Sequence, residues 1–184
     1  MNRRRFLAAS AVAGALPLAG CAARETTLQP DVETEDDETH VVYRDGDDRV
    51  AVVSYMQRGR ATRPPYDLWV TVSHAEGTTI DSLRLELDTA PAERPKPNVY
   101  LKTPDGHPYP SMHYHTDPDS GAAIVDVPDT ERQGSGSMSL EFLVAPRGEE
   151  VVTVGATASL SLSGRAVVGR VYELSDRVEF ELTP

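Results

Sequence analysis

The sequence predicts an all-β protein, built as an antiparallel two-sheet β-sandwich. Three observations predict this fold class: apolar and polar residues alternate with a period of two, turn-forming residues recur between the alternating segments, and no stripe of 3.6-residue period follows the N-terminal leader. Because successive strand side chains point to opposite faces, an alternating segment has one buried face and one solvent-exposed face, as strands of antiparallel sheets often do. Many short strands separated by turns indicate a sandwich, and a closed barrel is the alternative.

In the first half of the domain, glycine turns such as Asp45-Gly46 separate the expected strands. Leu68, Val70 and Val72 share one face of a segment that also contains Trp69. A tryptophan on an early strand resembles immunoglobulin-like domains, although the paired cysteines of that family are missing. This resemblance concerns the fold alone. The strands expected here are residues 40–44, 49–57, 67–74 and 80–88.

The second half contains the longest alternation, from Val152 to Leu162, where Val, Ala and Leu alternate with Thr, Gly and Ser. Met138, Leu140 and Phe142 share one face in the same way. Turn pairs rich in glycine again separate the segments. The strands expected here are residues 98–102, 122–127, 137–145, 151–162 and 165–182, the last dividing into two near Ser175-Asp176.

The N-terminus has the parts of a secretory signal. A basic start, Arg3-Arg4-Arg5, precedes an apolar run from Phe6 to Ala19, and small residues precede Cys21. The apolar run has 14 residues, whereas a bilayer span needs about 20, so it is too short for a permanent transmembrane helix. A hydrophobic leader followed by a chance cysteine is the alternative interpretation.

Two motifs in this leader resemble known export signals. Arg3-Arg4-Arg5-Phe6-Leu7 resembles the twin-arginine signal, an address read by a receptor, and Leu18-Ala19-Gly20-Cys21 resembles the lipobox of lipoprotein precursors. The resemblance implies export of a folded protein, removal of residues 1–20 as the signal peptide, and a two-chain lipid on Cys21. Two acyl chains give stable anchoring, so the expected location is the extracytoplasmic face of the cell membrane. Cys21 is the only cysteine, which leaves no thiol for a disulfide or a nucleophile.

The strongly negative net charge of the chain indicates that the protein works in concentrated salt. Removing the signal leaves 15 of the 18 basic residues against 29 acidic ones, so the net charge falls from −11 to −14. Self-repulsion of such a chain destabilises its compact state, and molar salt screens charges to about 3 Å. This acidic composition with only two lysines resembles secreted proteins of halophilic archaea, and an ordinary acidic bacterial surface protein is the alternative. Nucleic-acid binding is not expected, because it needs a basic stripe.

Residues 21–39 are expected to form the lipidated Cys21 and an acidic, disordered tether. Seven acidic residues lie between positions 22 and 39 against one base, Arg24, and large apolar side chains are almost absent. Such a segment cannot bury enough surface to offset its ordering entropy. A flexible spacer of that length would average roughly 25 Å, so it would hold a single domain of residues 40–184 off the membrane.

Residues 91–136 interrupt the alternation and contain eight of the 14 prolines and three of the five histidines. Because residues two apart share a face in an extended segment, His113 and His115 would clamp one Zn²⁺ or Cu²⁺ together. His107 is the candidate third ligand, and Met112 a soft fourth ligand for copper. An exposed polar loop without metal is the alternative.

The same region contains three tyrosines, Tyr100, Tyr109 and Tyr114. Their amphipathic rings are of the kind that contact protein partners or sugars. The alternative is that these rings cover the end of the sandwich.

No catalytic signature is present: the chain has no G-x-S-x-G, S-x-x-K or H-E-x-x-H motif and no glycine-rich phosphate loop. The expected function is a non-catalytic surface lipoprotein without a cofactor, which binds an extracellular protein, a glycan or a cell-wall component. An exported Cu/Zn-binding domain is the second hypothesis. A hydrolase with an unrecognised site is the third, although no spacing singles out a carboxylate pair.

Overall fold

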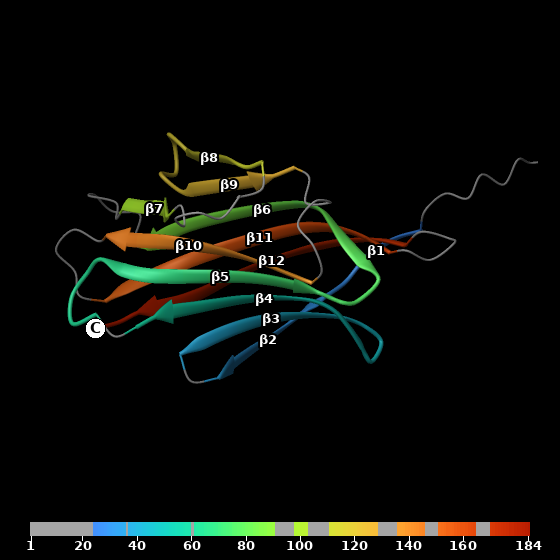
Figure 1. Ribbon diagram of the computed structural model, residues 1–184. Coiled ribbons are helices and arrows are strands. Elements are labelled where there is room, and N and C mark those ends of the chain that lie inside the picture. The colour runs from blue at the N-terminus through green and yellow to red at the C-terminus, as the bar shows by residue number, and fades with distance from the viewer. Residues whose placement is uncertain are drawn as a thin grey trace, which may run out of the picture.

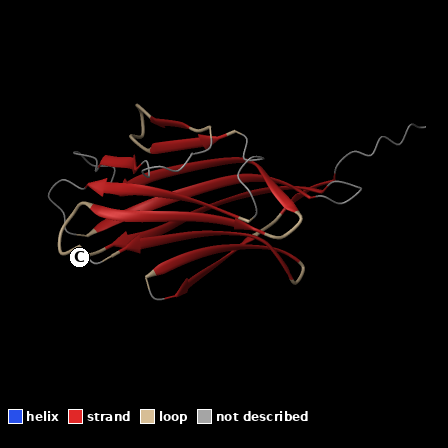
Figure 2. Ribbon diagram, viewed as in Figure 1, coloured by secondary structure: helices blue, strands red, loops and turns tan. Residues whose placement is uncertain are grey.

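The protein is all-β. The structure, a computed structural model, describes residues 24–35, 37–59, 61–90, 98–102, 111–128, 136–145, 151–164 and 170–184. Every regular element within these ranges is a strand (Figure 2). In the same ranges, no helix has the length and apolar character needed to cross a bilayer. The twin-arginine motif, the lipobox and Cys21 lie outside the described residues.

Two six-stranded sheets pack face to face (Figure 1). The strands are β1 (Arg24–Thr27), β2 (Pro30–Glu35), β3 (Glu38–Asp45), β4 (Asp48–Arg58), β5 (Tyr66–His74), β6 (Thr78–Ala90), β7 (Asn98–Lys102), β8 (His113–Thr116), β9 (Ala123–Val127), β10 (Ser137–Ala145), β11 (Val152–Gly164) and β12 (Arg170–Leu182). Sheet A has the order β1-β12-β11-β6-β9-β8, and sheet B has the order β2-β3-β4-β5-β10-β7. Only the β1–β12 pairing is parallel among those described. The predicted antiparallel two-sheet sandwich is therefore confirmed.

The hydrophobic core lies between the two sheets. On β10, Met138, Leu140, Phe142 and Val144 are buried, and the residues between them are more exposed. The Phe142 ring is fully buried, and burial of such a side chain contributes about 1.5–3 kcal/mol. The period-two pattern of the sequence thus places one face of each central strand in the core.

Most predicted strands are confirmed to within two residues at each described end. The predicted break near Ser175-Asp176 is wrong, because β12 continues from Arg170 to Leu182 and pairs with β11 throughout. The Ser175 hydroxyl faces solvent and lies 3.2 Å from that of Ser159 on β11. Polar residues here mark the wet side of a strand and not its end. The short strand β8, which the sequence pattern did not predict, pairs with β9 and has four exposed residues.

Residues 24–35 belong to the sandwich, so the prediction of a disordered tether is wrong for this part of the segment. Strand β1 extends sheet A beside β12, and β2 extends sheet B beside β3. Five of the six residues of β2 are exposed, so its backbone pairing and not its side chains holds it in place. Leu28, between the two strands, is buried in the core.

A small polar cluster interrupts the core. Asp176 points inward from β12 between Leu174 and Val178, and it lies near Tyr43 and Tyr55 of sheet B. Within the described residues, the Tyr43 Oη and the Asp176 Oδ2 are buried without a hydrogen-bond partner. Burial raises the pKa of Tyr43 well above its usual value, and the Asp176 carboxylate raises it further. The Tyr43 hydroxyl therefore stays protonated at any physiological pH.

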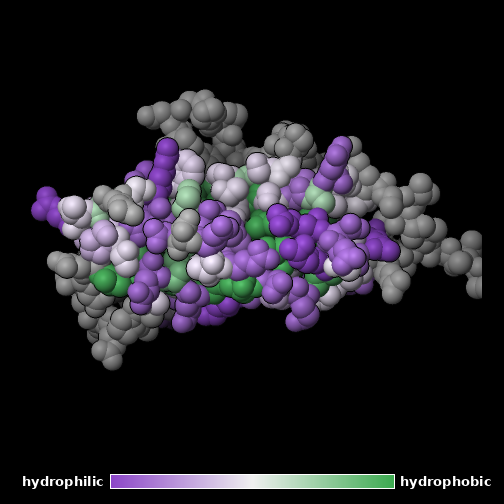
Figure 3. All heavy atoms as spheres, turned by 90° about the horizontal axis from the view of Figure 1, so that it is seen from below, coloured by the Kyte–Doolittle hydropathy of each residue, from purple (hydrophilic) through white to green (hydrophobic). Residues whose placement is uncertain are grey.

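The surface is strongly hydrophilic. Figure 3 shows polar and charged side chains over most of the described part of one face, with apolar side chains visible between them. Several arginines of the described part form exposed ion pairs, such as Arg44 with Glu33 and Arg84 with Asp126. Because acids outnumber bases so heavily, many carboxylates have no base to pair with.

Candidate functional site

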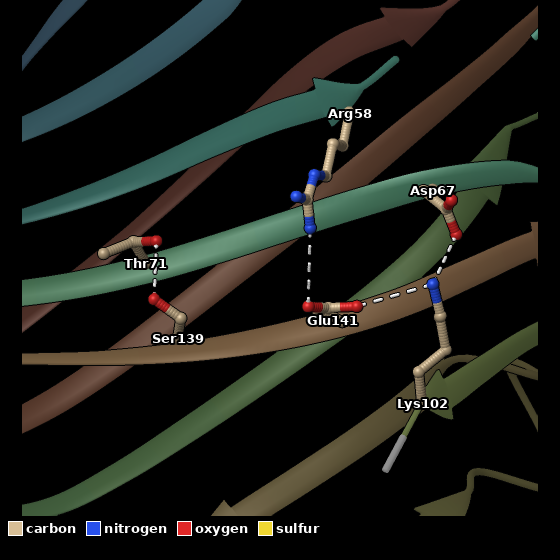
Figure 4. A network of polar contacts seen from close by, with 6 residues as sticks. All are labelled: Arg58, Asp67, Thr71, Lys102, Ser139 and Glu141. Atoms are coloured by element: carbon tan, nitrogen blue, oxygen red, sulfur yellow. Dashed lines mark hydrogen bonds and ion pairs between the residues drawn. The ribbon is translucent and has the colours of Figure 1, made fainter. Parts of the chain in front are cut away.

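The outer face of sheet B carries a polar network across four strands (Figure 4). We define the Trp69 network as Arg58 of β4, Asp67 and Trp69 of β5, Glu141 of β10 and Lys102 of β7. The Lys102 Nζ lies 2.9 Å from an Asp67 oxygen and 3.4 Å from a Glu141 oxygen. The Arg58 guanidinium lies 3.9 Å from the other Glu141 oxygen. The two cations therefore lie on the outer strands β4 and β7, and the two carboxylates lie on β5 and β10 between them.

Trp69 lies under this network and points away from the core. Its neighbours Leu68 and Val70 are buried inside the sandwich, whereas the guanidinium of Arg58 stacks on the indole ring at 3.9 Å from its centroid. The indole nitrogen is buried without a hydrogen-bond partner in the described part of the chain. Trp69 is thus a covered residue of the outer face of sheet B.

We expect Arg58→Ala to shift the fluorescence emission of Trp69, the only tryptophan, to longer wavelength, because water replaces the guanidinium over the ring. A cation–π contact at an exposed site contributes about 0.5–1 kcal/mol, so the urea midpoint should also fall slightly. Arg44→Ala removes another ion-paired arginine of the same sheet and should leave the emission unchanged. Identical spectra for Arg58→Ala and the native protein would contradict the stacked geometry.

The charged groups of the Trp69 network are neutralised by one another. Each carboxylate has a cation within 4 Å. The hydrogen bond from Lys102 to Asp67 raises the pKa of the lysine, so its amine stays protonated and is a poor nucleophile. This arrangement favours a rigid, charged surface rather than general acid–base chemistry.

Tyr100 and Tyr114 come together where the edges of the two sheets meet. The Tyr114 Oη on β8 donates a hydrogen bond to the Val99 carbonyl on β7 at 2.5 Å, so this contact joins sheet A to sheet B. Tyr100 and Tyr114 keep 48% and 39% of their surface exposed. Burial raises the pKa of Tyr114, and the neighbouring Tyr100 hydroxyl raises it further. We call Tyr100 and Tyr114 the tyrosine edge; Tyr109 lies outside the described residues.

His113 and His115 lie on the outer face of β8, and both are exposed. In the register, His113 stands opposite Asp126 and His115 opposite Ile124. The Asp126 carboxylate accepts a hydrogen bond from Arg84 at 2.8 Å. His107 lies outside the described residues, and those residues contain no group of three or more His, Cys, Asp or Glu side chains that could hold a metal.

Hydroxyl groups line the outer face of sheet A. A shallow hollow of about 270 Å³ lies beside Arg84 and Asp126 and is bordered by Ser82, Ser159 and Ser161. Further along the face, Arg177 of β12 crosses β11 to reach Asp88 of β6. This crossing requires Gly155 on β11, since a Cβ there would collide with both side chains.

Sequence reasoning placed the tyrosines and histidines in one region, and the structure brings Tyr100 and Tyr114 together while it keeps His113 and His115 on one face. It missed the Trp69 network. The alternation around Trp69 did show that this residue opposes Leu68 and Val70, which was a signal for an outward position. The partners of Trp69 come from three other strands, and no local pattern identifies them.

The comparisons with solved structures give distant likenesses. A chain of a type I cohesin–dockerin complex from Clostridium thermocellum is 11% identical with a TM-score of 0.39, covering 66% of this chain and 86% of that one. The reeler domain of human F-spondin is 11% identical with a TM-score of 0.36, covering 86% of this chain and 94% of that domain. No protein with a curated description matches the sequence.

A family profile covers the whole of the described sandwich. The profile of the family described as Domain of unknown function (DUF8121) matches residues 24–184, from the first residue of β1 onward. The chain therefore belongs to the DUF8121 family.

Proposed function

We propose that the protein is an exported lipoprotein, lipidated on Cys21 and held on the extracytoplasmic face of the cell membrane. The order and spacing of the twin-arginine motif and the lipobox support this address. The family match begins three residues after Cys21, which fits a leader that is separate from the folded domain. The acidic composition supports a working environment of concentrated salt.

The sandwich acts as a non-catalytic binding module for an extracellular protein or glycan. The observation that carries this proposal is the tyrosine edge, where two half-exposed rings stand at the adjoining edges of both sheets. Tyrosine presents a large, rigid contact area with a polar tip, which suits partner or sugar recognition. The paired charges of the Trp69 network point away from catalysis.

The test is a Tyr100→Ala/Tyr114→Ala double variant of the native lipoprotein. We expect its binding to glycan arrays, or to proteins cross-linked to it on cells, to weaken at least about tenfold, since buried aromatic anchors contribute about 2 kcal/mol or more each. Val32→Ala/Val151→Ala removes two other exposed apolar side chains and should bind normally. Equal binding by both double variants would remove the tyrosine edge from the proposed function.

A second candidate function is metal binding, which the common face of His113 and His115 on β8 favours. Two imidazoles fill half of a tetrahedral site, so we expect affinity for Zn²⁺ and Cu²⁺ no tighter than micromolar. Calorimetric titration of the native protein and of the His113→Ala/His115→Ala variant measures this. Submicromolar binding that the double variant loses would make metal binding the leading function.

A further inference from the structure

We infer that the sandwich stands end-on against the lipid headgroups, with one defined end at the membrane and the other directed outward. This inference rests on the proposed lipidation of Cys21. It gives the domain a membrane-facing surface and a partner for that surface, the headgroup layer of the bilayer.

Strand β1 fixes the position of the anchor. Arg24 is in register with Arg170, and the pairing continues to Thr27 beside Glu173. Three residue steps separate Cys21 from Arg24, and a chain of that length spans at most about 11 Å. A lipid on Cys21 therefore holds the start of β1 within about 11 Å of the membrane surface, in place of the long tether that the sequence suggested.

The turns beside the start of β1 form one end of the sandwich, which we call the anchor end. The Arg170 Nη1 donates to the Asp45 Oδ2 at 2.5 Å, and the Tyr172 Oη donates to the same oxygen at 3.0 Å. These bonds attach the β3–β4 turn of sheet B to the start of β12 in sheet A. The β5–β6 turn joins them, because the Ala75 amide donates to the Val50 carbonyl at 2.8 Å.

The opposite end, which we call the free end, lies one strand length away. Strand β12 has 13 residues and therefore spans about 40 Å. At its far end Gln57 of β4 makes two bonds to the Thr183 backbone, at 2.6 and 2.8 Å, and holds the two sheets together. Figure 1 shows β1 and the C-terminus at opposite sides of the sandwich. An open cleft of about 530 Å³ lies at this free end, between the β2–β3 turn and the end of β12.

Charge favours the same orientation. Anionic headgroups repel carboxylates, so the less acidic end should face them. Among the described side chains, carboxylates exceed arginines by two at the anchor end: Glu25, Asp45, Asp47, Asp48 and Glu76 with Arg44, Arg49 and Arg170. The excess rises to three at the free end: Glu35, Asp37, Glu38, Glu179 and Glu181 with Arg58 and Arg63.

The experiment measures energy transfer from each end to the membrane. Because lipidation blocks Cys21, Asp47→Cys or Asp37→Cys supplies the single free thiol for a donor dye, and both positions are exposed turn residues at opposite ends. The lipidated variants are placed in phosphatidylglycerol vesicles that contain a headgroup-labelled acceptor lipid. We expect transfer from the Asp47→Cys position to exceed that from the Asp37→Cys position several-fold. A spacer of about ten Gly and Ser residues between Ala23 and Arg24 should reduce the difference.

Equal transfer from both positions, or more from the Asp37→Cys position, would overturn the end-on orientation while the protein remains bound to the vesicles. Failure of the proposed lipidation gives a different result. Cys21 would then react with the dye, and the protein would not sediment with the vesicles.

Discussion

The Cys21→Ser variant will be released from membranes by an alkaline wash, whereas the native chain will need detergent. Serine has no sulfur to carry the lipid, and the leader alone is too short to span a bilayer. Each buried CH₂ of an acyl chain contributes about 0.8 kcal/mol to membrane binding, so losing two chains changes the distribution almost completely. Intact-mass analysis should find the lipid on a mature native chain that begins at Cys21.

The matched control is Arg3→Lys/Arg4→Lys, which keeps the charge of the leader but removes the arginine pair of the proposed export signal. We expect this variant to accumulate in the cytoplasm with its signal attached, a different fate from that of Cys21→Ser. A native chain that carries no lipid mass, or a Cys21→Ser chain that resists the wash, would contradict the proposed lipid anchor and membrane location.

The native protein will melt about 5–10 °C higher in molar KCl than in dilute buffer, equivalent to about 2–3 kcal/mol for a domain of this size. Two effects of salt compete. Salt weakens exposed ion pairs such as Arg84–Asp126, but each of these contributes about 1 kcal/mol or less. It also screens the repulsion that follows from a net charge of −14 after signal removal. The second effect is the larger one, because 14 negative charges remain after all pairing.

The β2–β3 turn offers a test of whether screening of charge repulsion causes the stabilisation by salt. A Glu35→Gln/Asp37→Asn/Glu38→Gln variant removes three neighbouring carboxylates at the free end. We expect it to melt higher than the native protein in dilute buffer and to gain less from KCl. Calorimetric scans across salt concentrations measure both quantities. A melting temperature of the native protein that stays flat with salt would remove the halophilic interpretation.

The central strands could be predicted because each has one buried face, which gives the sequence a period-two alternation of apolar and polar residues. Leu83, Leu85 and Leu87 alternate with charged residues, and the structure buries all three. The edge strands β2 and β8 could not be predicted in this way, because both of their faces are solvated and their side chains carry no alternation. Their strand conformation comes from backbone pairing with a neighbour, and that depends on where the neighbour lies.

The candidate site shows the same limit. Lys102 and Asp67 are 35 residues apart in the sequence. They meet because their strands, β7 and β5, both pair with β10 in sheet B, and the lysine side chain reaches across that strand. Strand order is set by the packing of the whole sandwich and has no local signature. The face of His113 and His115, by contrast, follows from their separation by two residues in an extended segment, so that part of the site was accessible from sequence.

The parallel pairing of β1 with β12 also has a consequence for biosynthesis. Within the described residues β12 is the one strand that pairs with β1. This pairing therefore cannot form until Arg170 has been synthesised, 146 residues after Arg24. Pairing of such high contact order forms late in folding. The nascent chain therefore keeps β1 unpaired on the ribosome until β12 has been synthesised. On the proposed export route, the machinery would receive the segment next to the leader in its final conformation only from a chain in which β12 has already paired with β1.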